Sequence, residues 1–190
     1  MIIWQKKYVT GLLLIMILLF SGYSATAEAR TITDMAGRKV VVPDKIKKVC
    51  TDWPIMEYLV YALDPALLAG LNTPFTDEQK NYLAPSVTRL PVIGGFFTRA
   101  KSPNLEAFLK VKPDVVIVEM SDKSDPNVKG EEILNKTGIP VVYVKVDTTR
   151  DYLQAFIFLG KLLGREKRAQ ALNAYGKAAF NEIEATIASL

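Results

Sequence analysis

Chemistry in this chain of 190 residues has to come from side chains other than histidine, because the sequence contains none. Catalysis by a Ser-His-Asp or Cys-His nucleophile and metal binding by imidazole are therefore excluded. Neither glycine-rich nucleotide-binding pattern, G-x-G-x-x-G or G-x-x-x-x-G-K-[ST], occurs. A carboxylate–lysine or serine–lysine pair stays open, although no spacing points to one. The sequence thus favours binding over catalysis.

Five side chains at the ends of predicted strands could form a binding site. They are Trp53, Phe96, Phe97, Arg99 and Glu119. Aromatic rings beside a guanidinium suit a large, partly apolar, anionic ligand, which they hold by stacking and paired hydrogen bonds.

Each of these residues also has a plain structural reading. Trp53 is equally compatible with packing beneath the helix that follows it, and only one of Phe96 and Phe97 points inward if their segment is extended. Arg99 suits a solvated surface charge, and Glu119 an exposed strand end. The site is therefore a hypothesis about the ends of strands, which depends on the fold.

The elements that must position these residues alternate between strand and helix. Apolar runs predict strands at 47–51, 67–71, 91–93, 115–119 and 141–146. Helical patterns lie between them at 54–63, at 77–83, after Ser102-Pro103 and at 131–136. Ser102 and Pro103 are expected to cap the third of these helices, with Leu105, Phe108 and Leu109 on one face. Strands apolar on both faces indicate an α/β fold, with a Rossmann-like parallel sheet and helices on both faces.

The two ends of this region differ from its middle. A β-hairpin is expected to turn at Asp34–Arg38, with Gly37 in the turn. A capping box of Thr148 and Asp151 starts a helix that Gly164 ends. Residues 165–190 then predict one long helix, roughly 39 Å at 1.5 Å per residue. Its apolar stripe needs a packing partner.

The N-terminus predicts export. Lys6 and Lys7 precede an apolar run from Val9 to Phe20 and an Ala-Thr-Ala site ending at residue 27, which is typical of a cleaved signal peptide. Ala27-Glu28-Ala29 offers a second cut site. A membrane anchor is the alternative, but the run is shorter than the roughly 20 residues that a span requires. No cysteine follows the run, so a lipid-modified N-terminus is not indicated, and the expected location is periplasmic.

Charge and cysteine content narrow the function further. Removing residues 1–27 takes away only Lys6 and Lys7, so the net charge falls from +4 to +2. No basic tract interleaved with aromatics occurs, and nucleic acid is not an expected partner. Cys50 has no second cysteine to pair with and is expected to be a small buried apolar residue. The expected domains are a signal peptide at 1–27, an α/β ligand-binding lobe at 28–147 and a helical segment at 148–190.

Several of these segments, taken in order, resemble a known family. They are Thr33–Arg38, Asp52–Glu57, Pro91–Gly94, Asn104–Glu106, Lys112–Ile117 and Leu162–Ala169. In this order the chain resembles the periplasmic substrate-binding proteins of ABC importers for iron complexes and vitamin B12, over essentially all of residues 30–190. The resemblance implies two α/β lobes joined by one long helix, with the ligand held between the lobes and passed to a membrane permease. Only the first lobe and the linking helix are recognisable, so a truncated product lacking the second lobe is expected.

The resemblance also implies roles for particular residues and a ligand class. A glutamate in the family's Asn-Leu-Glu motif docks with arginines of the permease, which carries that role onto Glu106. Alternatively, Glu106 simply complements the dipole of its own helix. Because histidine is absent, a bare transition metal is disfavoured as ligand and a chelated one is expected. A ferric siderophore is favoured, ahead of haem or a corrinoid, and no resident cofactor is expected. The alternatives are a cofactor-dependent enzyme of similar fold and a secreted structural or adhesion module.

Overall fold

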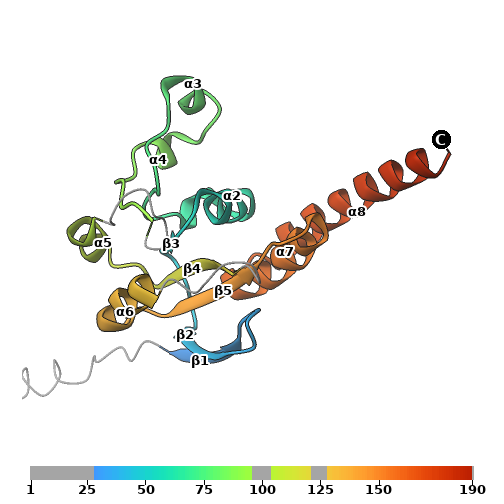
Figure 1. The fold of residues 1–190 in the computed structure, drawn as a ribbon. Helices are drawn as coiled ribbons and strands as arrows, with labels where there is room; N and C mark the ends of the chain where they lie inside the picture. Colours follow the sequence, from blue (N-terminus) through green and yellow to red (C-terminus); the bar gives the residue numbers. More distant parts are fainter. Residues whose placement is uncertain (1–27, 96–103, 121–127, 190) are drawn as a thin grey trace, which may run out of the picture.

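The fold of the chain is built around a parallel β-sheet (Figure 1). The structure is a computed structural model that describes residues 28–95, 104–120 and 128–189. The strands of the sheet, in the order β3-β4-β5, are β3 (Val49–Thr51), β4 (Val115–Met120) and β5 (Val141–Lys145). Both strand pairs are parallel, with Val49 opposite Val115 and Val116 opposite Val141. The α/β class is thus confirmed.

Two further segments extend the parallel pattern beyond β3, although neither forms a regular strand. Single parallel bridges join Val49 to Leu68 and Leu71 to Val92. The predicted strands at 67–71 and 91–93 are therefore wrong as strands but right in placement. The short 3-10 helix η1 (Pro65–Leu67) takes up the start of the first, and Pro91 has no N–H to donate at the start of the second.

With these bridges counted, the five segments lie across the sheet in the order third, second, first, fourth, fifth of their sequence. This is the doubly wound arrangement, in which the strand order reverses between the first and fourth segments. Here that reversal lies between β3 and β4.

Helices cover both faces of the sheet, and alternate residues of β4 point to opposite faces. Val115 and Ile117 belong to a buried cluster with α2 (Pro54–Leu63) and α7 (Thr149–Leu163). Val116 and Val118 belong to a second cluster, which contains Phe108 and Leu134 from the two helices α5 (Leu105–Val111) and α6 (Val128–Thr137). Cys50 lies in this second cluster, buried and unpaired as expected. A continuous apolar strand therefore reflects burial on two sides.

The short helices between the second and third segments differ from the prediction. A helix was expected at 77–83, whereas α3 (Asp77–Lys80) makes a single turn and α4 (Pro85–Thr88) follows it. Thr76 and Gln79 form a capping box at the start of α3. Pro85 then starts the second turn at its first position, where a missing N–H costs nothing.

The cap and face predicted for α5 also need correction. Asn104, rather than Ser102 and Pro103, caps this helix, and its Oδ1 accepts a hydrogen bond of 3.0 Å from the Ala107 N–H. Of the three apolar residues expected on one buried face, Phe108 is buried but Leu105 and Leu109 are 41% and 47% exposed. The helix has only seven residues, which is two turns, so Phe108 alone is fully buried, while Ala107 and Val111 are partly buried against the same cluster.

The N-terminal hairpin forms as predicted and covers the outer edge of β5. Strands β1 (Ala29–Thr33) and β2 (Lys39–Pro43) are antiparallel, and Gly37 has a φ of +79° in the turn. From this turn, the Met35 N–H donates to the Tyr143 carbonyl at 3.1 Å, and the Tyr143 N–H donates to Asp34 Oδ2 at 3.2 Å. Arg38 lies over the Tyr143 ring at 3.9 Å. The hairpin therefore satisfies backbone groups that an open edge strand would expose.

A helical hairpin of α7 and α8 (Glu166–Ala188) ends the fold. Thr148 and Asp151 make the predicted capping box, and Gly164 ends α7 with a φ of +65°. Gly160 permits close packing, since a Cβ there would lie 2.3 Å from the Ala169 Cβ. The far end of α8 projects beyond α7 (Figure 1), with Ile183 and Ile187 exposed.

Candidate functional site

The candidate site lies at the ends of β3 and β4, where the strand order reverses. In doubly wound sheets, ligands bind outside the carboxyl ends of the strands at this point. Asp52 and Trp53 directly follow β3, while Glu119 and Met120 complete β4. We call this region, with Asn72 and Asp147 at the neighbouring strand ends, the carboxyl edge.

Asp52 joins the two central strands at this edge. Its N–H donates to the Ile117 carbonyl at 3.1 Å, and its Oδ1 accepts a hydrogen bond of 3.1 Å from the Glu119 N–H. The side chain is buried, with the residue 3% exposed. Burial raises the pKa of the Asp52 carboxyl to about 7, the nearby Glu119 charge adds to the rise, and backbone N–H donors oppose it. Near neutral pH, Asp52 therefore exchanges a proton readily.

Two more carboxyl groups follow at the adjoining strand ends. Burial raises the pKa of Glu119, and the charge of Asp147 raises it further. Asp147 forms an ion pair with Lys145, whose Nζ lies 3.4 Å from Oδ2. The described part of the edge is therefore acidic across β3, β4 and β5, and it favours proton donors or positive groups on a ligand.

A buried polar network supports this edge from below. The Asn72 Nδ2 group donates to Thr51 Oγ1 at 2.6 Å and to Glu57 Oε2 at 3.0 Å, and the Asn72 N–H donates to the same Glu57 oxygen at 2.9 Å. Burial raises the pKa of Glu57, while these hydrogen bonds lower it. The Asn72 Oδ1 atom is buried without a partner among the described residues. The network fixes α2, and with it Trp53, to the strand ends.

Sequence reasoning missed the role of Glu57, although a signal was present. Glu57 falls four residues after Trp53 and three before Val60, on the apolar side of the predicted helix. A carboxylate is rarely buried unless it is hydrogen-bonded. An acidic residue at a core position of a helix therefore indicates a buried partner, here Asn72.

The residues predicted to bind ligand fall into two groups. Trp53 lies at the N-terminus of α2 with 43% of its surface exposed, and Glu119 is linked to it through Asp52. Trp53 is thus open at the carboxyl edge and not enclosed beneath its helix. Phe96, Phe97 and Arg99 lie outside the described residues.

Glu106 lies in a different place, in the first turn of α5. It is exposed and lines a cavity of about 450 Å³ together with Asn104 and Lys110. Its carboxylate is available to a partner, while the same position also complements the N-terminal end of its helix.

Part of the chain matches a known protein family. Residues 97–190 match a family model described as "Periplasmic binding protein". Over these residues the chain is therefore similar to the periplasmic binding protein family. No curated protein matches the chain in sequence.

Solved structures of ABC transporter proteins share the fold. An ABC transporter solute-binding protein from Sulfurospirillum deleyianum has 30% identity and a TM-score of 0.74, over 84% of this chain and 50% of its own. A periplasmic solute-binding protein from Veillonella parvula has 25% identity and a TM-score of 0.64, over 83% and 47%. The molybdate-binding protein MolA of Haemophilus influenzae has 23% identity and a TM-score of 0.61, over 76% and 49%. This chain therefore spans about half the length of these periplasmic binding proteins, consistent with a single lobe.

In 28–95, 104–120 and 128–189, no helix is both long and apolar enough to cross a membrane. Within the same ranges, no three His, Cys, Asp or Glu residues are grouped so that they could hold a metal ion.

Proposed function

We propose that this chain is a substrate-binding component of an ABC importer, which captures a chelated metal complex and delivers it to a membrane permease. The observation that carries the proposal is the exposed Trp53 at the switch point of a doubly wound sheet, in a chain with this family's fold. The chain itself is not expected to catalyse a reaction, and a cleaved signal peptide would take it to the periplasm.

A ferric siderophore is the favoured ligand, with haem or a corrinoid such as vitamin B12 behind it. The argument rests on this chain's residues: histidine is absent, so a metal is best taken up with its chelator already around it. Trp53 offers a flat surface for the chelator.

Relatives with known ligands share the fold but are distant in sequence. MolA was solved with molybdate at 23% identity, and BauB with acinetobactin and ferric iron at 14%. At such identities the likeness supports the fold and leaves the ligand open. Molybdate is therefore a useful competing probe.

Tryptophan fluorescence tests the ligand proposal directly. The chain has two tryptophans, Trp4 and Trp53, so cleavage at residue 27 leaves Trp53 as the sole reporter. We expect saturable quenching by a ferric catecholate or ferric hydroxamate complex, and weaker quenching by haem, cobalamin or molybdate. Calorimetry with Trp53→Ala should show affinity reduced about fivefold, the order of one aromatic contact.

A matched variant separates stacking from general damage. Tyr58 lies on the same helix and is also exposed, so Tyr58→Ala should keep the affinity. Equal losses in both variants would remove Trp53 from the site. Absence of saturable binding by every metal complex would overturn capture by this chain.

For delivery, we propose that Glu106 contacts the permease. Its exposure in the first turn of α5, a helix that contributes none of the residues assigned to the carboxyl edge, supports a role in docking rather than in ligand contact. In cells, Glu106→Ala should reduce uptake while the affinity for ligand is unchanged. Glu182 is an exposed glutamate on α8. The control variant Glu182→Ala should keep normal uptake. Normal uptake by the Glu106 variant would contradict the docking role.

A further inference from the structure

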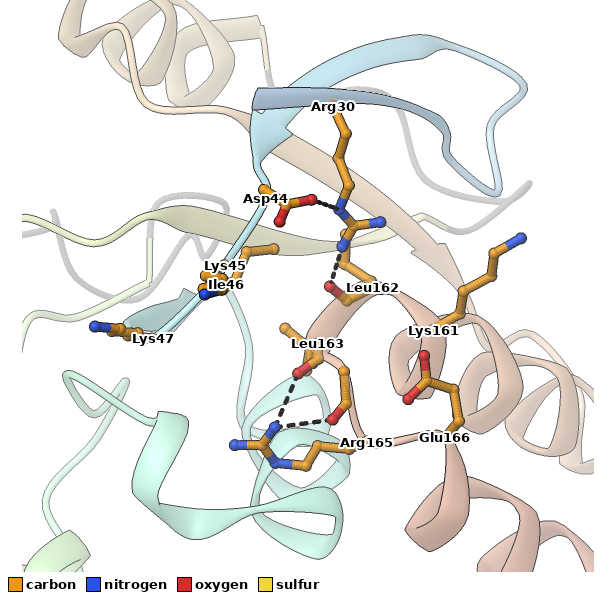
Figure 2. A pocket seen from close by; sticks show the side chains of 11 residues that line it. Arg30, Asp44, Lys45, Ile46, Lys47, Lys161, Leu162, Leu163, Arg165 and Glu166 are labelled. Carbon is orange, nitrogen blue, oxygen red and sulfur yellow. Dashed lines mark hydrogen bonds and ion pairs between the residues drawn. The ribbon is translucent and has the colours of Figure 1, made fainter. Parts of the chain in front are cut away.

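A second cavity, distinct from the one beside Glu106, lies at the end of the sheet opposite the carboxyl edge, where the chain enters β3. Its volume is about 540 Å³, within the range of small-molecule sites. The hairpin, the segment leading into β3, the end of α7 and the start of α8 all contribute to its walls (Figure 2). We call this region the amino edge. It is lined by Arg30, Asp44, Lys45, Ile46, Lys47, Lys161, Leu162, Leu163, Gly164, Arg165 and Glu166.

Positive charge dominates this cavity. Its lining has five basic side chains against two acidic ones, Asp44 and Glu166. Charges that surround a concave surface reinforce one another, because the low-dielectric walls focus their field. The cavity therefore attracts anions more strongly than a flat surface with the same residues would.

The two arginines remove the main obstacle to an anion here, which is the carbonyl-rich end of α7. Arg30 Nη2 donates to the Leu162 carbonyl at 2.6 Å, and Arg165 Nη1 donates to the carbonyls of Leu163 and Gly164 at 3.3 and 2.8 Å (Figure 2). These bonds occupy groups whose negative ends would otherwise repel an anion. Arg30 is only loosely paired with Asp44, with Nε 3.9 Å from Oδ1.

The three lysines of the lining, unlike the two arginines, have no ion-pair partner among the described residues. Lys45, Lys47 and Lys161 are exposed, and none has an ion-pair partner within the part of the chain that the structure describes. Lys47 and Lys161 lie on opposite sides of the cavity (Figure 2). A single surface lysine is normally solvated and binds nothing. Here, three unpaired lysines from two chain segments surround one cavity, so they can act on the same anion. Their ammonium groups can swing toward a shared anion.

We propose that the amino edge is a binding site for a phosphate-type oxyanion. Arg30 forms its floor, and Lys45, Lys47 and Lys161 provide donors at its rim. The same chemistry serves a free phosphate or the headgroup of an anionic lipid. The site is independent of the ligand at the carboxyl edge.

Thermal unfolding of the purified chain tests the proposal. Phosphate should raise the melting temperature above that in sodium chloride of equal ionic strength, in a saturable way, because a ligand of the folded state stabilises it. The double variant Lys45→Gln/Lys161→Gln should weaken phosphate binding about fivefold, as expected for two exposed charges. Co-sedimentation with phosphatidylcholine vesicles, with and without phosphatidylglycerol, identifies the source.

A control of equal charge makes the result decisive. Lys136→Gln/Lys177→Gln removes two exposed lysines outside this cavity, and it should bind phosphate as the parent does. Binding of phosphate alone, or of phosphatidylglycerol vesicles alone, supports the site and names its source. No specific binding to either, or equal losses in both double variants, would overturn it.

Discussion

The two ends of the sheet have opposite charge and opposite burial. At the carboxyl edge, Asp52 and Glu57 are buried and fixed by hydrogen bonds to backbone and side chain. At the amino edge, Lys45 and Lys161 are exposed and unpaired among the described residues. Burial makes each carboxyl expensive to disturb and changes its pKa, whereas exposed lysines contribute little to stability and are free to meet a partner.

The largest difference between the edges should appear as pH dependence. In the folded protein, burial raises the pKa of the Asp52 carboxyl from its ordinary value of 3.8 to about 7. Between these values the folded state holds a proton that the unfolded state has lost, so stability falls as pH rises from about 4 to about 7 and then levels off. Asp52→Asn should remove the part of this loss that is due to Asp52, a relative gain of about 3–4 kcal/mol at pH 8 over pH 4, while the parts due to Glu57 and Glu119 remain.

Urea unfolding at several pH values measures this effect. Glu166→Gln, which neutralises an exposed carboxylate at the amino edge, should keep the parent's profile. Parallel profiles for the parent and Asp52→Asn would show that Asp52 does not hold its proton.

Breaking the hydrogen-bond network of Asn72 and Glu57 should lower the free energy of unfolding by nearly as much as the pH effect at Asp52. Asn72→Ala removes both Nδ2 hydrogen bonds and leaves the buried Glu57 with the backbone N–H alone. We expect a loss of about 2–3 kcal/mol in the free energy of unfolding, because a buried charged group loses a donor. In Glu57→Gln, the further change Asn72→Ala should cost less. If the two losses simply add, the residues do not form one network.

Removing the Arg165 guanidinium at the amino edge should lower the free energy of unfolding by a smaller amount. Arg165→Gln removes an ion pair with Asp64, 2.8 Å long and partly exposed, and two bonds to the end of α7. We expect a loss of about 1 kcal/mol. The part due to Asp64 should shrink in high salt. A loss unaffected by salt would assign the whole effect to capping of the helix.

The smallest effect is expected for the lysines. Lys45→Gln/Lys161→Gln should change the free energy of unfolding by no more than about 0.5 kcal/mol, since exposed unpaired charges rarely contribute more. The same unfolding series measures it. A clear gain in stability would mean that mutual repulsion strains the fold, and a large loss would reveal a structural role.

Local signals were strong where one residue's chemistry dictates the backbone. Gly37 in its turn, Gly164 after α7 and the Thr148–Asp151 capping box were all predicted and found. The second and third sheet segments were not predicted in form, because the extent of a strand depends on its neighbours. Similarly, α5 buries only Phe108, since its short length and the position of the sheet decide which side chains are covered.

The candidate site divides in the same way. The order of segments placed Trp53 and Glu119 at strand ends, and that order follows from alternating apolar runs. That Asp52 bonds to Glu119, and that Asn72 holds Glu57, requires residues far apart in sequence to meet. No local pattern contains that information.

By itself, the sequence determined the class of fold, the hairpin, the helical ending and the absence of imidazole chemistry. These depend on composition, periodicity and backbone preferences that act over a few residues. Only the tertiary structure decided that one edge of the sheet is acidic and buried while the other is basic and open. Burial and pKa depend on which segments pack together, and the sheet brings together segments up to a hundred residues apart, from Asp52 to Asp147.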